Sequence, residues 1–273
     1  MKAKSFVLAG GFVVGAIILG CGGGGGGVGN SDFIYYVDNG VNIIRQDFPT
    51  GNPFTAGSGT SMSEVRISPD KSQMLFVNNN QLYLVNTNGT GLTTLTGYRA
   101  GDWNSDGSKV FAISTTGNKI RSMNPDGTGV SGDLFNGNFG GGIFSIDLND
   151  AGTKIGVVYA PSGWAQIHTM NLDGSGLFAV TAAGTNRNNA RWKPDGTSFV
   201  YEQGSDIRTV LVGGTGDAPL ANTVAVEGQP SFRDNNTIVY ISDDDIWTMA
   251  ADGSAQVEIF NGTNPLSWPE SKN

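Results

Sequence analysis

The chain has 273 residues, with 16 lysines and arginines against 24 aspartates and glutamates, and a net charge of −8. This balance excludes ordinary nucleic-acid binding, which depends on neutralising phosphates with lysine and arginine. The 42 glycines and 10 prolines indicate many turns, and the length suits one large β domain.

The first twenty residues are typical of an export signal. Lys2 and Lys4 precede an apolar stretch at residues 6–19, which is shorter than the roughly 20 residues that a membrane-spanning helix needs. A short basic start, an apolar middle and small residues at the end are the arrangement of a secretory signal peptide. We therefore expect residues 1–20 to be removed.

The letters ILGC at residues 18–21 resemble the lipobox of bacterial lipoproteins. The resemblance implies cleavage after Gly20 and attachment to the membrane through lipid on Cys21, the only cysteine. Gly22 in the next position, rather than Asp, resembles the sorting pattern for the outer membrane. An ordinary signal peptide with a chance cysteine is the alternative.

Six glycines follow Cys21. A phosphate-binding loop would need a lysine and a hydroxyl residue after its glycines, whereas Val28, Gly29 and Asn30 stand there. A glycine-rich linker behaves as a flexible coil of roughly 5–6 Å × √n, or about 14 Å for six residues. Residues 21–31 are therefore expected to be a tether.

Five similar stretches then recur at intervals of about 40 residues. Each combines an apolar or aromatic residue, a tight turn of Asp, Asn and Gly, and a run rich in β-forming residues. They read VRISPDKSQMLFV from Val65, GDWNSDGSKVFAI from Gly101, IDLNDAGTKIGVV from Ile146, ARWKPDGTSFVYE from Ala190 and PSFRDNNTIVYIS from Pro230. We call the apolar or aromatic residue before the turn the key position of each repeat. In the five copies and a truncated sixth, the key positions are Ile67, Trp103, Leu148, Trp192, Phe232 and Trp268.

Every full copy continues into alternating apolar residues and a Gly-rich or Asp-Gly turn, which are hairpin signals. These segments read QLYLVNTNGTG from Gln81, KIRSMNPDGTG from Lys119, QIHTMNLDGSG from Gln166, DIRTVLVGGTG from Asp206 and DIWTMAADGSA from Asp245. One repeat therefore predicts four short strands joined by hairpins, which is one blade of a β-propeller.

The two ends of the repeat region carry complementary parts of one blade. Residues 32–51 supply later strands without a first strand, and the segment from Pro265 supplies a first strand with nothing after it. Their pairing would close a ring and remove open sheet edges. The sequence thus predicts an all-β fold, a six-bladed β-propeller over residues 32–273 closed by pairing of its N- and C-terminal strands.

The repeats resemble TolB-like and WD-repeat-like propellers, whose blades carry W-S-P-D-G followed by I-Y-x-M-x-x-D-G. The nearest matches are Trp192-Lys193-Pro194-Asp195-Gly196 and Ile246-Trp247-Thr248-Met249 with Asp252-Gly253. The resemblance implies an architecture rather than an activity. TolB also carries an α/β domain before its propeller, and the resemblance does not extend to that domain.

The only histidine, His168, would be the natural general base. The repeat alignment instead puts it in the third strand of a blade, which favours a structural role. The residues aligned with it are Tyr83, Arg121, Arg208 and Trp247. We expect no catalytic residue.

Asp243, Asp244 and Asp245 raise the question of a Ca²⁺ site, because that ion prefers hard oxygen ligands. The other repeats place a hairpin turn at this point, which favours a solvated turn. We expect no metal ligand and no cofactor, with Ca²⁺ the one ion left open.

Propellers present binding residues from loops at one rim. In this chain the irregular residues of the connections between blades are the candidates for a partner-binding rim. They are Glu64, Arg99, Asp102, Phe139, Arg187, Asn188, Glu227 and Gln229.

The leading hypothesis is a monomeric, non-enzymatic, lipid-anchored propeller that binds a protein or glycan in the bacterial cell envelope. The outer membrane is favoured, with the propeller facing the periplasm or the outside. One alternative is a hydrolase or lyase that acts on an envelope polysaccharide or peptide in the central channel. Another is a purely structural surface lipoprotein.

Overall fold

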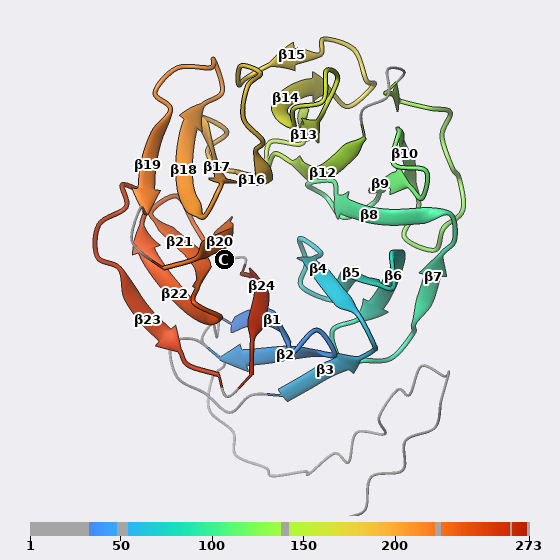
Figure 1. Ribbon diagram of the computed structural model, residues 1–273. Helices are drawn as coiled ribbons and strands as arrows, with labels where there is room; N and C mark the ends of the chain where they lie inside the picture. The colour runs from blue at the N-terminus through green and yellow to red at the C-terminus, as the bar shows by residue number, and fades with distance from the viewer. Residues whose placement is uncertain (1–32, 48–53, 138–141, 222–224, 263, 272–273) are drawn as a thin grey trace, which may run out of the picture.

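The computed structural model describes residues 33–47, 54–137, 142–221, 225–262 and 264–271. Over these ranges six antiparallel sheets of four strands each surround one axis (Figure 1). The all-β, six-bladed propeller expected from the repeats is confirmed. No helix among the described residues is long and apolar enough to cross a membrane.

The strands of each sheet are best described by their distance from the axis. The innermost strands are β4 (Met62–Ile67), β8 (Tyr98–Trp103), β12 (Ile143–Leu148), β16 (Asn188–Trp192), β20 (Glu227–Phe232) and β24 (Leu266–Glu270). The second strands are β5 (Gln73–Asn78), β9 (Val110–Ser114), β13 (Lys154–Tyr159), β17 (Ser198–Gln203), β21 (Thr237–Ser242) and β1 (Phe33–Asp38).

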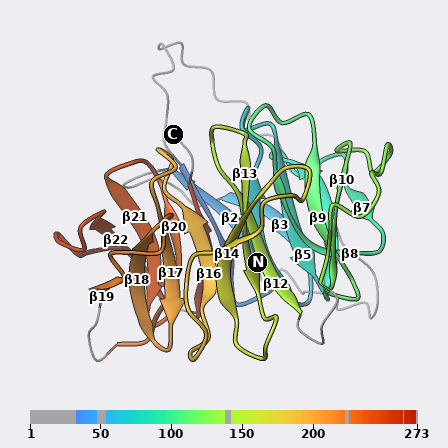
Figure 2. The same ribbon diagram turned by 90° about the horizontal axis from the view of Figure 1, so that it is seen from above.

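The third strands are β6 (Gln81–Asn86), β10 (Lys119–Met123), β14 (Gln166–Asn171), β18 (Asp206–Leu211), β22 (Asp245–Ala250) and β2 (Asn42–Asp47). The outermost strands are β7 (Thr93–Leu95), β11 (Phe135–Asn136), β15 (Phe178–Ala179), β19 (Ala218–Ala221), β23 (Val257–Phe260) and β3 (Phe54–Ser58). Figure 2 shows the sheets side by side from above.

The ring is closed by the two ends of the chain, as the sequence predicts. The sheet order is β24-β1-β2-β3, so the C-terminal strand is the innermost strand of the blade that the N-terminal strands begin. Strands β24 and β1 are antiparallel, with Tyr35 opposite Glu270 and Asp38 opposite Leu266. Closure gives each blade two neighbours.

The core of the molecule lies between the blades. Six clusters of buried apolar residues each combine strands from two neighbouring sheets. Tryptophans reinforce two of these contacts. The indole Nε1 of Trp103 donates to the carbonyl oxygen of Arg66 at 3.2 Å, and that of Trp192 donates to the carbonyl oxygen of Asp147 at 3.0 Å. Each bond joins one blade to the preceding one.

Close approach of the blade β12–β15 to the blade β16–β19 depends on Gly156. A Cβ atom there would lie 2.6 Å from a ring atom of Phe199 and 2.9 Å from Nε1 of Trp192. These two aromatic rings are themselves in contact, with centroids 4.1 Å apart. A larger residue at position 156 would push the blades apart.

A β-bulge interrupts the pairing of the innermost strands, and it corrects one sequence assignment. In β4, β16 and β20 the residue three places before the key position has a left-handed backbone, with φ of 50° at Glu64, 48° at Asn189 and 50° at Gln229. Trp268 has the same conformation, with φ of 54°. It is therefore the bulge residue of β24, and Ser271 occupies the key position that the alignment gave to Trp268.

Removal of residues 265–273 should destabilise the propeller strongly, because it deletes β24 and exposes the edge of β1. The loss of the buried Leu266 and of the strand pairing should lower the melting temperature by about 10 °C or more. Removal of residues 272–273 alone is the matched control and should have little effect. Equal melting temperatures for the two truncations, measured by circular dichroism, would contradict closure by β24.

Candidate functional site

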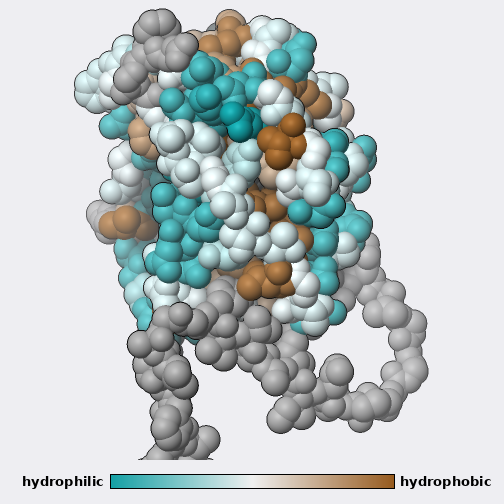
Figure 3. Space-filling model, turned by 90° about the vertical axis from the view of Figure 1, so that its right-hand side faces the viewer, coloured by the Kyte–Doolittle hydropathy of each residue, from teal (hydrophilic) through white to brown (hydrophobic). Residues whose placement is uncertain are grey.

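The two ends of the central channel offer the candidate sites. We call the side on which the innermost strands begin the start face, and the side on which they end the end face. The described residues line a cavity at each of these faces. On the side of the outer wall that Figure 3 displays, single apolar residues are scattered among polar ones, so this side presents no large apolar patch for binding.

The start-face cavity has a volume of about 580 Å³ and an acidic lining. Its carboxylates are those of Glu202, Glu227, Asp243 and Asp244. Asp243 and Asp244 form the turn between β21 and β22, with φ of 49° and 70°, which confirms the hairpin turn expected there. Val226 lies beside them and is 65% exposed. The cavity is therefore open, negative and partly apolar.

A hydrogen-bond network that joins three blades fixes the wall of the start-face cavity. One carboxylate oxygen of Glu202 on β17 accepts hydrogen bonds from Asn189 Nδ2, at 2.7 Å, and from the backbone N–H of Gln229. The side-chain oxygen of Gln229 accepts a hydrogen bond from the backbone N–H of Trp268. Glu202 was not singled out from the sequence. Its carboxylate at the end of the apolar run SFVYEQ could have marked it as a candidate site residue.

Most of the rim residues expected from the sequence lie near the start face, but only two of them line its cavity. Five of them lie in the first three positions of innermost strands, near the start face, namely Glu64, Arg99, Asn188, Glu227 and Gln229. Of these, Glu227 and Gln229 line the start-face cavity. Arg187 directly precedes β16 and donates to the carbonyl oxygens of Ala182 and Thr185 at 2.7 Å. Phe139 lies outside the described residues.

Asp102 lies elsewhere, at the far end of β8, where it is only 3% exposed. Most of the expected rim residues are also in strands rather than in the connections between blades. The bulges explain this, because they allow each innermost strand to continue pairing on both sides of an extra residue.

Asp102 belongs to a ring of polar side chains around the channel that the sequence did not identify as a site. In every blade it is the residue directly before the key position. The ring consists of Arg66, Asp102, Asp147, Arg191, Ser231 and Glu270. The aligned repeats show this position directly before the key position. A charged residue there is equally compatible with the protein surface, so the sequence does not identify it as part of a site.

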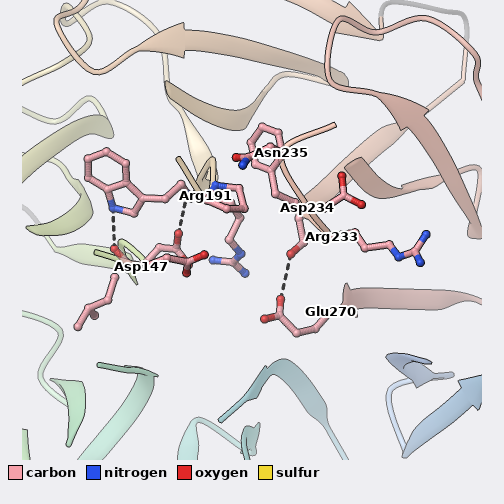
Figure 4. Close-up of a pocket in the computed structure, with 12 residues that line it drawn as sticks. Asp147, Arg191, Arg233, Asp234, Asn235 and Glu270 are labelled. Atoms are coloured by element: carbon pink, nitrogen blue, oxygen red, sulfur yellow. Dashed lines mark hydrogen bonds between the residues drawn. The ribbon is translucent and has the colours of Figure 1, made fainter. Parts of the chain in front are cut away.

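Carboxylates of the ring tie neighbouring blades together. Asp102 accepts a hydrogen bond from the backbone N–H of Leu148 at 2.7 Å, and Asp147 accepts one from that of Trp192 at 2.6 Å. Glu270 accepts a hydrogen bond from the hydroxyl of Ser231 at 3.0 Å. Figure 4 shows the bonds of Asp147 and Glu270 on either side of Arg191.

The end-face cavity has a volume of about 220 Å³ and is built on this ring. Four ring residues line it, and Asp150, Arg233 and Asp234 stand at its mouth beyond the innermost strands. The key residues Leu148, Trp192 and Phe232, together with Pro194, form its apolar walls. This cavity combines buried charge with apolar surface.

Burial, and after it the charge of the neighbouring Asp102, raise the pKa of the Asp147 carboxyl to about 7 against the opposing effect of Arg191 and Arg66. Burial also lowers the pKa of Arg191, and the charge of Arg66 adds to that effect. The ring thus places charged side chains close enough together to shift the pKa values of Asp147 and Arg191.

His168 lies in the third strand β14, as the repeat alignment expects, and is paired with Val157 of β13. It is 5% exposed, its Nδ1 is 3.2 Å from the carbonyl oxygen of Gln166, and its ring meets that of Tyr159 edge to face. Burial lowers its pKa. It does not line either channel cavity. The described residues contain no group of three His, Cys, Asp or Glu that could hold a metal ion.

The raised pKa of Asp147 predicts a specific pH dependence of stability. Between the ordinary carboxyl pKa of about 4 and the folded value of about 7, the folded chain holds this proton more tightly than the unfolded chain. The contribution of Asp147 to the free energy of unfolding should therefore fall as the pH rises through this window, by on the order of 2 kcal/mol between pH 5 and pH 8.

Urea unfolding of the wild type and of Asp147→Asn at pH 5 and pH 8 measures this contribution. The variant should lack that part of the pH dependence, and the exposed Asp173→Asn should retain it. The same pH dependence in the wild type and in Asp147→Asn would contradict the assignment.

Comparison with known proteins supports the fold. No family model and no curated protein matches the sequence. Among solved structures, TolB from Acinetobacter baumannii is similar at 15% identity and a TM-score of 0.74, over 89% of this chain and 67% of that one. A chain of the nidogen/laminin complex is similar at 10% identity and a TM-score of 0.72, over 87% of this chain and 97% of that one.

An oligogalacturonate lyase in complex with manganese is also similar, at 13% identity and a TM-score of 0.57, over 83% of this chain and 71% of that one. At such identities a likeness concerns the fold, which these proteins combine with different roles. By its architecture, the chain is a TolB-like six-bladed β-propeller.

Proposed function

We propose that this chain is a lipid-anchored, non-enzymatic propeller of the bacterial cell envelope that binds a protein partner at its start face. The acidic start-face cavity is the observation that carries the proposal. The nidogen/laminin complex supports it in general terms, because this fold is found there in an assembly of proteins. The lipobox resemblance at residues 18–21 supports the anchor.

The position of strand β1 supports a separation of the anchor from the cavity. Strand β1 begins at Phe33, whose carbonyl oxygen accepts a hydrogen bond from the hydroxyl of Ser271 at 3.2 Å. Phe33 therefore lies at the end face, and the chain from Cys21 reaches the propeller there. Lipid on Cys21 would turn the end face toward the membrane and leave the start face open to a partner.

The chemistry of the start face favours a partner with a basic segment. Four carboxylates line the cavity, and the whole chain carries a net charge of −8. Opposite charge on the partner would speed association and fix its orientation. The exposed Val226 adds apolar contact area beside the carboxylates.

A photocrosslinking residue at position 226 tests the site in the native envelope. The matched control places the same residue at Val257, which is 54% exposed on the outer strand β23. We expect protein adducts from position 226 that are absent from position 257 and that weaken as salt is added. Identical adducts from both positions, or none from position 226, would defeat the proposal, and a glycan adduct would favour a glycan partner.

Removal of charge at the start face should weaken this binding. Asp243→Asn with Asp244→Asn keeps the turn, because asparagine tolerates positive φ, and it removes two of the carboxylates. Adduct yield from position 226 should fall several-fold, whereas Asp173→Asn, in a turn at the end face, should have no effect. An unchanged yield in the double variant would show that charge is not part of recognition.

Lipid attachment is tested by Cys21→Ser. This variant should incorporate no labelled fatty acid and should leave the membrane fraction, because the chain has no second cysteine. The wild type, labelled in parallel, is the reference. Unchanged labelling of the variant would rule out the anchor without affecting the test of the start face.

A further inference from the structure

Arg191 in the end-face cavity has hydrogen-bond donors that nothing in the described structure satisfies. It is only 6% exposed, and its Nε and Nη1 atoms have no acceptor among the described residues. Nε of Arg66, which is 3% exposed, is in the same situation. Buried polar groups are almost always hydrogen-bonded, and a buried charge without partners is costly. These donors therefore call for an acceptor from outside the chain.

The neighbouring carboxylates are already engaged with other groups. One oxygen each of Asp102 and Asp147 binds a backbone N–H of the next blade, and one oxygen of Glu270 binds the hydroxyl of Ser231. In Figure 4 the guanidinium of Arg191 points into the space between Asp147 and Glu270. The missing acceptor would thus lie inside the cavity.

The size and walls of the cavity indicate what kind of molecule carries that acceptor. A cavity of 150 Å³ can hold benzene, and this one measures about 220 Å³. Trp192, Phe232 and Leu148 give it apolar walls. An organic molecule of roughly the size of a substituted benzene ring would fill it better than an inorganic ion would.

The charges at the mouth limit the ligand further. Asp150, Arg233 and Asp234 line the mouth, and Asp147 and Glu270 lie deeper, so that the carboxylates around the cavity outnumber the arginines. A second negative charge on the ligand would face these carboxylates and be repelled. A carboxylate is the natural single anion for an arginine, because charge-assisted hydrogen bonds between the two are strong.

We propose that the end-face cavity binds a small organic acid with a single carboxylate, which accepts hydrogen bonds from Arg191. Arg66 adds positive charge from across the channel, and the apolar body of the acid packs on Trp192 and Phe232. This site is distinct from the start face and goes beyond the proposed partner binding.

Titration calorimetry with sodium benzoate as the probe tests the site in the full chain. Benzoate should bind the wild type, and Arg191→Gln should weaken binding at least tenfold. Arg121→Gln, which removes an arginine paired with Asp133 on the outer part of a blade, is the matched control and should bind as the wild type does. Equal affinity of the wild type and Arg191→Gln for benzoate would overturn the proposal.

Ligand selectivity of the wild type provides a test that does not depend on the folding of a variant. Benzamide has the shape of benzoate without its charge, and phthalate has a second carboxylate, so both should bind at least tenfold more weakly than benzoate. Equal binding of benzamide and benzoate would overturn the role of Arg191. No binding of benzoate at millimolar concentration would mean that only water fills the cavity, and would also overturn the proposal.

Discussion

Closure of the ring by β24 and β1 is the constraint on which the rest of the structure depends. A single blade has apolar residues on both faces of its sheet and cannot bury them alone. Pairing of the two chain ends gives all six blades a neighbour on each side, so that six similar cores form between them. The same closure places six innermost strands around one axis and creates a channel.

The channel then determines where charge can be buried. A residue next to a packed position in an innermost strand turns toward the axis, and six such residues meet there. Some of their charges have structural partners, since Asp102 and Asp147 bind backbone N–H groups of the following blades. Arg191 has no such partner at Nε and Nη1. Two buried donors without acceptors carry a considerable desolvation cost, which the proposed ligand would offset.

The two ends of the channel differ in a way that suits a molecule attached at one side. The start face is open and acidic, with Val226 exposed beside Asp243 and Asp244. The end face has a smaller cavity, a buried arginine and the beginning of β1. Because β1 begins at the end face, the proposed tether before it would leave the opposite opening accessible.

The sequence by itself determined the strand content, the number of blades and the closure, because hairpin turns and alternating apolar residues are local signals that repeat every blade. It also determined that His168 belongs to a third strand and that Asp243 and Asp244 form a turn. It misplaced the key position of the last repeat, since an aromatic residue at a bulge, Trp268, looks like a packing residue when only its type is known.

Only the tertiary structure decided which polar residues meet. Arg66, Asp102, Asp147, Arg191, Ser231 and Glu270 come from six different repeats, and each lies about 40 residues from the next. Glu202 likewise meets Gln229 from another blade. Such contacts depend on the closed ring and not on local spacing, because a side chain beside a buried residue can face either the axis or the solvent until the neighbouring blades are in place.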